Sequence, residues 1–147
     1  MKTITYIASK KEDGLVNISL PVCIFSNGLS GLEAISKYLV EITGLRYCQI
    51  ADLLNRDDRT IWDAHNGAKR KSHEDFSKEI SSINIPIKIF GNRSLSILES
   101  LTAYLREEFN LRYCQIASLL NKDDRTIWTV YDRARKKRKN EELRQNN

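Results

Sequence analysis

The chain has few of the residues that mark secreted, fibrous or membrane-spanning proteins: 3 cysteines, 2 prolines and 6 glycines among 147 residues. Cys23, Cys48 and Cys114 show no CxxC or Cys/His ligand spacing, so there is no recognisable zinc motif or disulfide framework. We expect Cys48 and Cys114 to be small buried side chains on apolar helix faces, in a reducing compartment. No apolar run is long enough to span a membrane, and no signal-peptide pattern opens the chain. These absences predict a cytoplasmic protein without membrane contact.

Catalytic and cofactor-binding patterns are missing as well. The sequence shows no nucleophile–base pair, no phosphate-binding loop and no metal constellation. His65 and His73 have no ligand partners at any standard spacing, and nothing converges on the adjacent acids Asp57 and Asp58. We therefore expect a protein that is not an enzyme and that holds neither a cofactor nor a metal.

Basic residues outnumber acidic ones, and they are unevenly distributed. The formal net charge is +5 with a pI near 9.2, which favours a polyanionic partner. Residues 18–71 hold 7 Lys or Arg against 6 Asp or Glu, whereas residues 83–138 hold 11 against 6. The second range therefore carries most of the excess positive charge.

One passage of the sequence occurs twice. Leu45–Trp62 reads LRYCQIADLLNRDDRTIW and Leu111–Trp128 reads LRYCQIASLLNKDDRTIW, which are identical at 16 of 18 positions. The similarity starts further upstream, where Ile18–Asn27 matches Ile83–Asn92. Each unit has about 55 residues, and two units are too few for a solenoid. The repeat therefore predicts two tandem domains.

The repeat divides the chain into five segments. We expect an N-terminal β-hairpin or arm over 1–17, a first domain over 18–71, a linker over 72–82, a second domain over 83–138 and a polar tail over 139–147. The tail should continue the last helix and then become disordered. Because the second unit contains a capping box, an apolar stripe and a helix pair of its own, residues 83–147 should fold alone.

Each unit predicts a first helix with a defined start and end. Ser30 with Glu33, and Ser96 with Glu99, fit the capping box that opens a helix. The helices should end near Gly44 and Asn110, residue types that tolerate positive φ. An apolar stripe should run along each helix, made of Leu32, Ile35, Leu39 and Ile42 in one and of Leu98, Leu101, Leu105 and Phe109 in the other.

The repeated passage predicts two further helices joined by a tight turn. A short helix over 47–54 should be followed by Asn55 in a left-handed conformation and by Asp57 as the N-cap of a longer helix. Small residues at Ala51 and Ala117 should let the two helices cross closely. The inner face of the longer helix should carry Ile61, Ala64, His65 and Ala68, or Ile127, Val130, Tyr131 and Ala134. Each unit thus predicts a helix-turn-helix within a mainly α fold.

The sequence GLRYCQIADLLNRDDRTIWDAHNGAKRK resembles the helix-turn-helix of the C-terminal promoter-reading region of bacterial sigma factors. The shared pattern is Ile-Ala, Leu-Leu, a turn, a polar pair followed by Thr-Ile, and a basic helix end. The pattern covers roughly the last half of each unit. Two features depart from the family: the turn has Asn where Gly is commoner, and two acidic residues open the second helix. The resemblance implies a DNA-reading second helix.

In such a motif the second helix presents its N-terminal residues to base edges in the major groove. Arg59 and Arg125 are the first candidates for base readout, because a guanidinium can bind guanine bidentately. Alternatively, each could pair with a neighbouring aspartate. The full set of expected outward positions is Asp58, Arg59, Trp62, Asp63 and Asn66 in the first copy and Asp124, Arg125, Trp128, Thr129 and Asp132 in the second.

The other candidates have two interpretations each. Thr60 and Thr126 could bond a phosphate or reinforce the helix start, and Trp62 and Trp128 could pack on the preceding helix or lie along a sugar or thymine methyl. Basic residues at the helix ends suit phosphates, although a solvated charged face is the usual alternative. These residues are Lys69, Arg70, Lys71, Arg133, Arg135, Lys136 and Lys137.

We therefore expect a sequence-dependent double-stranded DNA-binding protein, associated with the nucleoid and acting in transcriptional control. An architectural protein with little sequence preference is an alternative, and its affinity for different sequences would be flat. In a further alternative, the first domain binds a protein partner and the second binds DNA, which the charge asymmetry allows. The sequence is also compatible with a homodimer.

Overall fold

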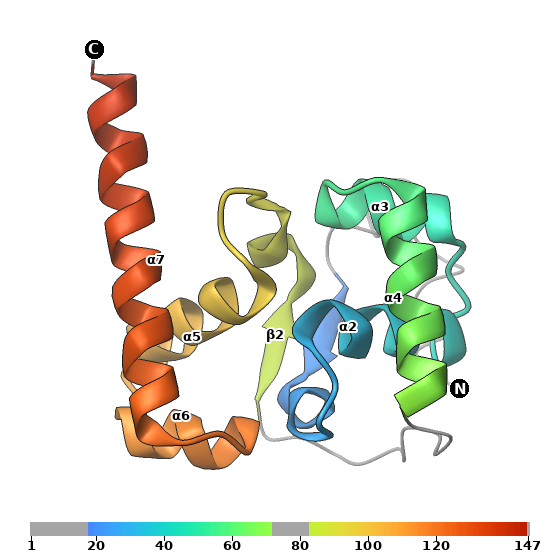
Figure 1. Ribbon diagram of the computed structural model, residues 1–147, viewed down its shortest axis with the longest axis horizontal. Helices are drawn as coiled ribbons and strands as arrows, with labels where there is room; N and C mark the ends of the chain where they lie inside the picture. Colours follow the sequence, from blue (N-terminus) through green and yellow to red (C-terminus); the bar gives the residue numbers. More distant parts are fainter. Residues whose placement is uncertain (1–17, 72–82, 147) are drawn as a thin grey trace.

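The computed structural model describes residues 18–71 and 83–146. In this part of the chain the protein is mainly helical, as expected, with a small two-stranded antiparallel sheet at its centre (Figure 1). The expected hairpin over 1–17 and the linker over 72–82 lie outside the described residues.

The described elements form two similar sets on either side of the sheet (Figure 1). The first set consists of β1 (Ser19–Pro21), the 3-10 helix η2 (Val22–Ser26), α2 (Gly31–Glu41), α3 (Tyr47–Leu54) and α4 (Asp58–Lys71). The second set consists of β2 (Asn84–Pro86), the 3-10 helix η3 (Ile87–Gly91), α5 (Ile97–Glu108), α6 (Tyr113–Leu120) and α7 (Asp124–Gln145). Since α7 continues to Gln145, the polar tail extends the last helix as predicted.

The first helix of each set starts at the capping box that the sequence predicts. The backbone N–H of Ser30 donates to Glu33 Oε1 over 2.9 Å, and the Glu33 N–H donates to Ser30 Oγ over 3.3 Å. Ser96 and Glu99 repeat this exchange at 2.8 and 3.1 Å. Two amides that would otherwise lack partners at each helix start are thereby satisfied.

The predicted left-handed residues occur where the helices end. Asn110 has a φ of 52°, and Gly44 one of 71°. Asn55 and Asn121 both have a φ of 55° and end the short helices α3 and α6. These turns reverse the chain sharply, so that each second helix can pack across the one before it.

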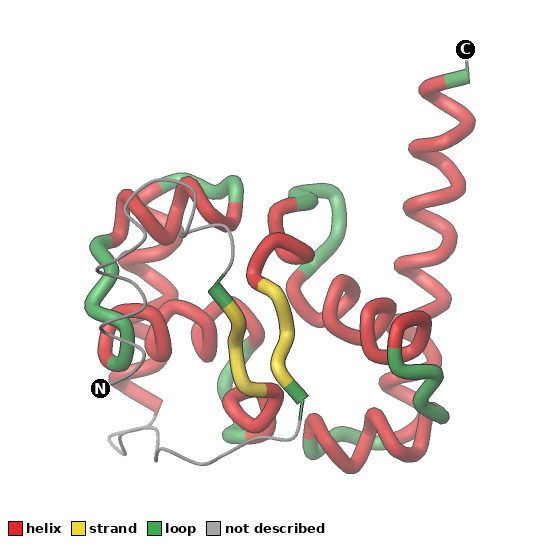
Figure 2. Tube along the Cα trace, turned by 180° about the vertical axis from the view of Figure 1, so that it is seen from behind, coloured by secondary structure: helices red, strands yellow, loops and turns green. Residues whose placement is uncertain are grey.

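The sheet has a register that is symmetric with respect to the sequence repeat. Leu20 pairs with Ile85, and these two residues occupy equivalent positions in the two units. On either side of this pair, the Val22 N–H donates to the Ile83 carbonyl over 3.1 Å and the Ile87 N–H donates to the Ile18 carbonyl over 2.9 Å. Figure 2 shows the two strands side by side between the two helical sets. An approximate two-fold axis therefore passes between Leu20 and Ile85.

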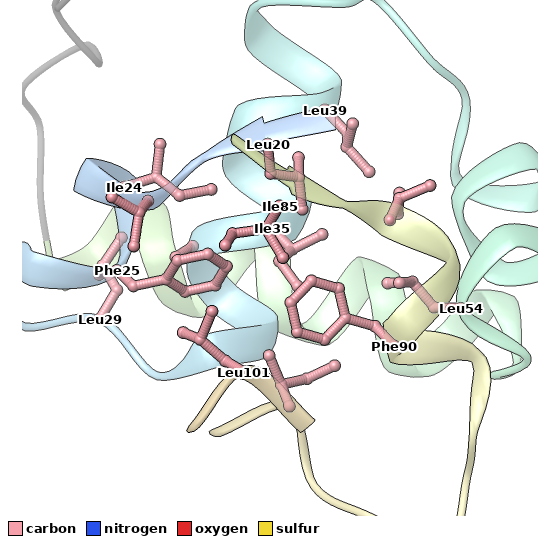
Figure 3. Close-up of a cluster of buried hydrophobic side chains, with 14 of the residues drawn as sticks. Leu20, Ile24, Phe25, Leu29, Ile35, Leu39, Leu54, Ile85, Phe90 and Leu101 are labelled. Atoms are coloured by element: carbon pink, nitrogen blue, oxygen red, sulfur yellow. The ribbon is translucent and has the colours of Figure 1, made fainter. Parts of the chain in front are cut away.

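The two sets share one hydrophobic core. Phe25 and Phe90, again at equivalent positions, have ring centroids 5.9 Å apart (Figure 3). Beyond them the contacts cross over, because α3 packs on η3 and α6 packs on η2. Leu54, for example, lies beside Phe90 in Figure 3. Each range thus contributes to the core of the other, and whether residues 83–147 fold alone stays a prediction to be tested.

Two expectations about burial are wrong. Cys48 and Cys114 are exposed, because each precedes the buried isoleucine of its short helix by two residues, or about 200° of rotation. Phe109 is 42% exposed, since it lies beyond the end of α5, where the helix no longer directs it into the core. The remaining predicted stripe residues are buried or half-buried.

Candidate nucleic-acid interface

The candidate interface is built from two equivalent helix pairs, α3 with α4 and α6 with α7, each joined by a short turn. Ala51 and Ala117 are 2% and 3% exposed, and their small side chains let the paired helices approach closely, as predicted. Ile61 and Ile127 are fully buried and anchor the inner face of the second helix. With this face fixed, the rotation of each second helix about its axis is determined.

Each second helix starts on an aspartate cap. Asp57 Oδ1 accepts the Thr60 N–H over 2.8 Å, and Asp123 Oδ1 accepts the Thr126 N–H over 2.7 Å. The backbone hydrogen bond to Thr126 lowers the pKa of Asp123, and the nearby Arg125 charge adds to this effect. Both carboxylates are therefore used within the helix start, as predicted for N-caps.

The candidate base-reading arginines point into solvent. Arg59 and Arg125 are exposed, and neither forms an ion pair with any residue in 18–71 or 83–146. Among the described residues, therefore, neither arginine pairs with a neighbouring aspartate, which was the alternative interpretation. Both guanidinium groups keep their donors available.

The tryptophan that follows the buried isoleucine is exposed in both helices. Trp62 is 52% exposed and Trp128 is 53% exposed, so each ring has a large free surface. This exposure leaves nearly half of each residue covered, so partial packing against the preceding helix stays compatible with the structure. The two second helices thus present an indole ring at equivalent positions.

The remaining outward positions divide by their contacts. Asp58, Asp63 and Asp124 are exposed, whereas Thr126 is half-buried. The other four make contacts within their own helix or its cap. Thr60 Oγ1 donates to Asp57 Oδ1 over 2.9 Å, and Asp132 forms an ion pair with Lys136 at 2.8 Å. Asn66 Nδ2 donates to the Trp62 carbonyl over 2.8 Å, and Thr129 Oγ1 donates to the Arg125 carbonyl over 2.9 Å. For Thr60, this contact matches the interpretation that it reinforces the helix start.

Part of the basic set is used inside the fold. Lys71 Nζ lies 2.9 Å from Glu33 Oε1, and the equivalent Lys137 Nζ lies 2.7 Å from Glu99 Oε1. These ion pairs join the last residue of α4, and the middle of α7, to the capping box of the first helix in the same set. One signal of these ion pairs was present in the sequence, because both partners recur at equivalent positions in the repeat.

Other basic residues remain available to a ligand. Lys69, Arg70 and Arg133 are exposed, and the part of the chain that the structure describes offers them no ion pair. Arg135 is also exposed and lies 6.0 Å from the centre of the Tyr131 ring. The positive charge available to a polyanion is thus smaller than the sequence count indicates, and it is concentrated near the ends of α4 and within α7.

Both second helices are presented on one side of the molecule. In Figure 1, α4 passes in front of α3 and α7 passes in front of α6, while the two run in opposite directions on either side of the sheet. This is the arrangement that the two-fold axis imposes, since an axis along the view keeps equivalent elements at the same depth. In this view, therefore, the two second helices lie on the same side of the molecule.

Comparison with protein-family models, with curated proteins and with solved structures finds no match for this chain. Among the described residues, no group of three or more His, Cys, Asp or Glu side chains could hold a metal ion. None of the described helices is both long and apolar enough to cross a membrane.

Proposed function

We propose that this protein binds double-stranded DNA in a sequence-dependent manner, through two helix-turn-helix motifs formed by α3–α4 and α6–α7, and that it acts in transcriptional control. The observation that carries the proposal is the matching exposure of Arg59 with Trp62 on α4 and of Arg125 with Trp128 on α7. The buried isoleucine between them fixes which side chains point outward.

The proposed contacts follow from the chemistry of the exposed side chains. An α-helix fits the major groove, and its first turns lie nearest the base edges. There Arg59 and Arg125 would bind guanine, while the indole rings of Trp62 and Trp128 would cover a thymine methyl or a sugar. The carboxylates of Asp58 and Asp124 repel phosphates but can accept from the amino group of cytosine, which favours selection over uniform binding.

Contacts to phosphates would supply affinity, and contacts to base edges would select the DNA sequence. Lys69, Arg70 and Arg133 have no ion pair within the described ranges and are suited to this role. The second range carries the larger net positive charge, since residues 83–138 hold 11 basic against 6 acidic residues. We therefore expect the second pair to contribute most of the affinity and the first pair to add specificity.

The adaptor alternative keeps one observation in its favour, which is the low net charge of the first range, 7 basic against 6 acidic residues. In that case α4 would contact a protein and α7 alone would contact DNA. The architectural alternative instead predicts equal affinity for all duplexes.

The test is a binding titration of the full chain, followed by fluorescence anisotropy, with duplexes selected from a random pool and with scrambled duplexes. Arg125→Ala should weaken binding to the selected duplex by about 1–3 kcal/mol and reduce its preference over the scrambled one. Lys88→Ala removes an exposed positive charge outside the second helices and serves as the matched control. Equal affinity for selected and scrambled duplexes would favour the architectural alternative, and absence of duplex binding would refute the proposal.

Arg59→Ala distinguishes the adaptor alternative, in which α4 contacts a protein, from the proposal that both second helices bind DNA. If both second helices bind DNA, this variant should lose protection over one half of the selected site, and Arg125→Ala should lose protection over the other half. An unchanged footprint and affinity for Arg59→Ala would show that α4 is not on the DNA.

A further inference from the structure

We infer that the DNA target of this chain is an imperfect inverted repeat, with two half-sites related by a two-fold axis, and not a direct repeat. The inference rests on the proposed function and specifies the class of DNA that it would recognise. A tandem sequence repeat by itself is compatible with either arrangement.

The orientation follows from which residues meet between the two sets. Three pairs of repeat-equivalent residues contact one another: Leu20 with Ile85, Phe25 with Phe90, and Gly31 with Ile97. When units are related by translation or by a screw, a residue contacts a different residue of the next unit. Only a two-fold axis brings equivalent residues to face each other, as in the isologous interface of a symmetric dimer.

The remaining contacts between the sets are exchanged in pairs, as a two-fold axis requires. α3 packs on η3 while the equivalent α6 packs on η2, and the two flanking strand hydrogen bonds are equivalent as well. The chain is thus arranged like a two-fold dimer whose halves are joined covalently. Figure 1 shows the consequence at the interface, where α4 and α7 run in opposite directions.

Two helices related in this way read the two DNA strands in opposite senses. Dimeric helix-turn-helix proteins bind half-sites about 10 base pairs apart, or a multiple of that, and operator symmetry mirrors protein symmetry. The shared core fixes the spacing between α4 and α7, because neither set can move without breaking it. We therefore expect one preferred half-site spacing and little tolerance for inserted base pairs.

The two half-sites should be similar but not identical. Both second helices begin with the same Asp-Arg-Thr-Ile-Trp segment, so the base pairs under the first turn should match in the two arms. The next outward position differs, with Asp63 on α4 and Thr129 on α7. The exposed Asp63 carboxylate can accept from a base amino group, whereas Thr129, whose hydroxyl donates to the Arg125 carbonyl, offers a methyl group that suits a thymine methyl. The arms should therefore differ at the positions these two residues face.

The first test is selection from a pool of random duplexes with the full chain, followed by alignment of the enriched sequences. An enriched inverted repeat with one spacing supports the inference. An enriched direct repeat, or two half-sites at variable spacing, overturns it while leaving the proposed function intact. Failure of the chain to bind any duplex, or binding without enrichment, removes the proposed function and the inference together.

The second test uses the exposed Cys48 and Cys114 as equivalent attachment points for a DNA-cleaving iron chelate. In a Cys23→Ala background, Cys114→Ser leaves a reagent on α3 only, and Cys48→Ser leaves one on α6 only. On the selected duplex, a two-fold reader should give two cleavage patterns that exchange strands and are superimposed by rotating the duplex by half a turn. Patterns on the same strand that are superimposed by translation would overturn the inverted orientation.

Two exchange variants test the inequality of the arms. Asp63→Thr should make the selected half-site of α4 resemble that of α7, and Thr129→Asp should make the half-site of α7 resemble that of α4. Unchanged selection in both variants would show that these positions do not read the arms.

Discussion

Gly31 and Ile97 occupy the same position in the two units, and they meet at the two-fold axis. A Cβ atom placed on Gly31 would lie 2.5 Å from Ile97 Cγ2 and 2.7 Å from Ile97 Cβ. The axis thus has room for one side chain at this position but not for two. The two units therefore cannot carry the same large side chain at this position, and Gly31 leaves the space that Ile97 fills.

Gly31→Ile should therefore overpack the axis and lower the free energy of unfolding by about 1–3 kcal/mol or more. The double variant Gly31→Ile with Ile97→Gly exchanges the two residues across the axis and should recover most of that loss. Chemical denaturation of both variants measures the difference. A double variant no more stable than Gly31→Ile would contradict the two-fold packing.

The shared core predicts that the isolated fragment 83–147 does not fold. It lacks Leu20, Val22 and Phe25, so β2 has no partner strand and Phe90 loses its ring contact. Thermal melting followed by circular dichroism should show no cooperative transition, in contrast to the full chain at the same concentration. The fragment should also stay monomeric in sedimentation, because two copies would place Ile97 against Ile97. A cooperative transition in a monomeric fragment would restore the expectation of separable domains.

Lys137 should contribute to stability more than the adjacent Lys136. Lys137 pairs with Glu99, whose side chain is only 5% exposed, whereas Lys136 pairs with Asp132 on the surface of the same helix. Lys137→Met leaves a buried carboxylate without its cation, which should cost about 1–3 kcal/mol. Lys136→Met, the matched control, should change stability by less than about 1 kcal/mol. If both variants lose the same free energy of unfolding in urea denaturation, Lys137 does not have the predicted stabilising role.

The effect of Lys137→Met should also depend on pH. Burial opposes ionisation of Glu99, but the hydrogen bond from Lys137 and the capping-box contacts with Ser96 outweigh it and hold the pKa of Glu99 below its ordinary 4.5. A carboxyl with a lowered folded pKa adds stability above the unfolded pKa, and this stability is lost as the pH falls through the folded pKa. The difference between wild type and variant should therefore be largest above pH 4.5 and shrink in more acidic solution.

His65 should make the first set sensitive to mild acid. Its Nδ1 lies 2.8 Å from the Tyr47 hydroxyl, and its side chain is buried among Glu41, Lys69 and Lys37. Burial is the main cause that lowers the pKa of His65 below 6.5, Lys69 and Lys37 add to it, and Glu41 opposes it. The unfolded chain therefore takes up a proton more readily, and the free energy of unfolding should fall as the pH drops below 6.5.

The second set provides the control for His65. Tyr131 occupies the equivalent position and donates its hydroxyl to Glu107 over 3.0 Å, so His65→Tyr has a precedent within the same chain. The variant should lose less stability than the wild type between about pH 7 and pH 5. Parallel losses for both proteins would show that His65 does not cause the acid sensitivity.

Trp62 and Trp128 should matter for binding and not for folding. Because both rings are more than half exposed, Trp62→Ala and Trp128→Ala should change the free energy of unfolding by about 0.5 kcal/mol or less. Each should weaken binding to a selected duplex by more than about 1 kcal/mol. Leu143→Ala, which removes an equally exposed side chain near the end of α7, is the control and should affect neither property. Large losses of stability in the tryptophan variants would indicate that the rings belong to the core.

The local structure of each unit could be predicted from the sequence. The two capping boxes, the left-handed Asn55 and Asn121, the aspartate caps and the buried Ile61 and Ile127 all follow from short-range chemistry, in which a side chain meets backbone within a few residues. The repeat strengthened each prediction because the same local pattern occurs twice. For the same reason the exposure of Arg59 and Arg125 could be predicted, although Asn66, Thr129 and Asp132 from the same predicted set are half-buried.

How the two units combine, and which side chains remain free, depends on tertiary packing and could not be predicted. The pairing of Leu20 with Ile85 joins residues far apart in the sequence, and periodicity within one unit carries no information about the partner strand. The engagement of Lys71 and Lys137 by capping-box glutamates likewise depends on one helix crossing another. Because a two-fold axis arises from packing between units, the opposed orientation of α4 and α7 could not be read from either unit alone.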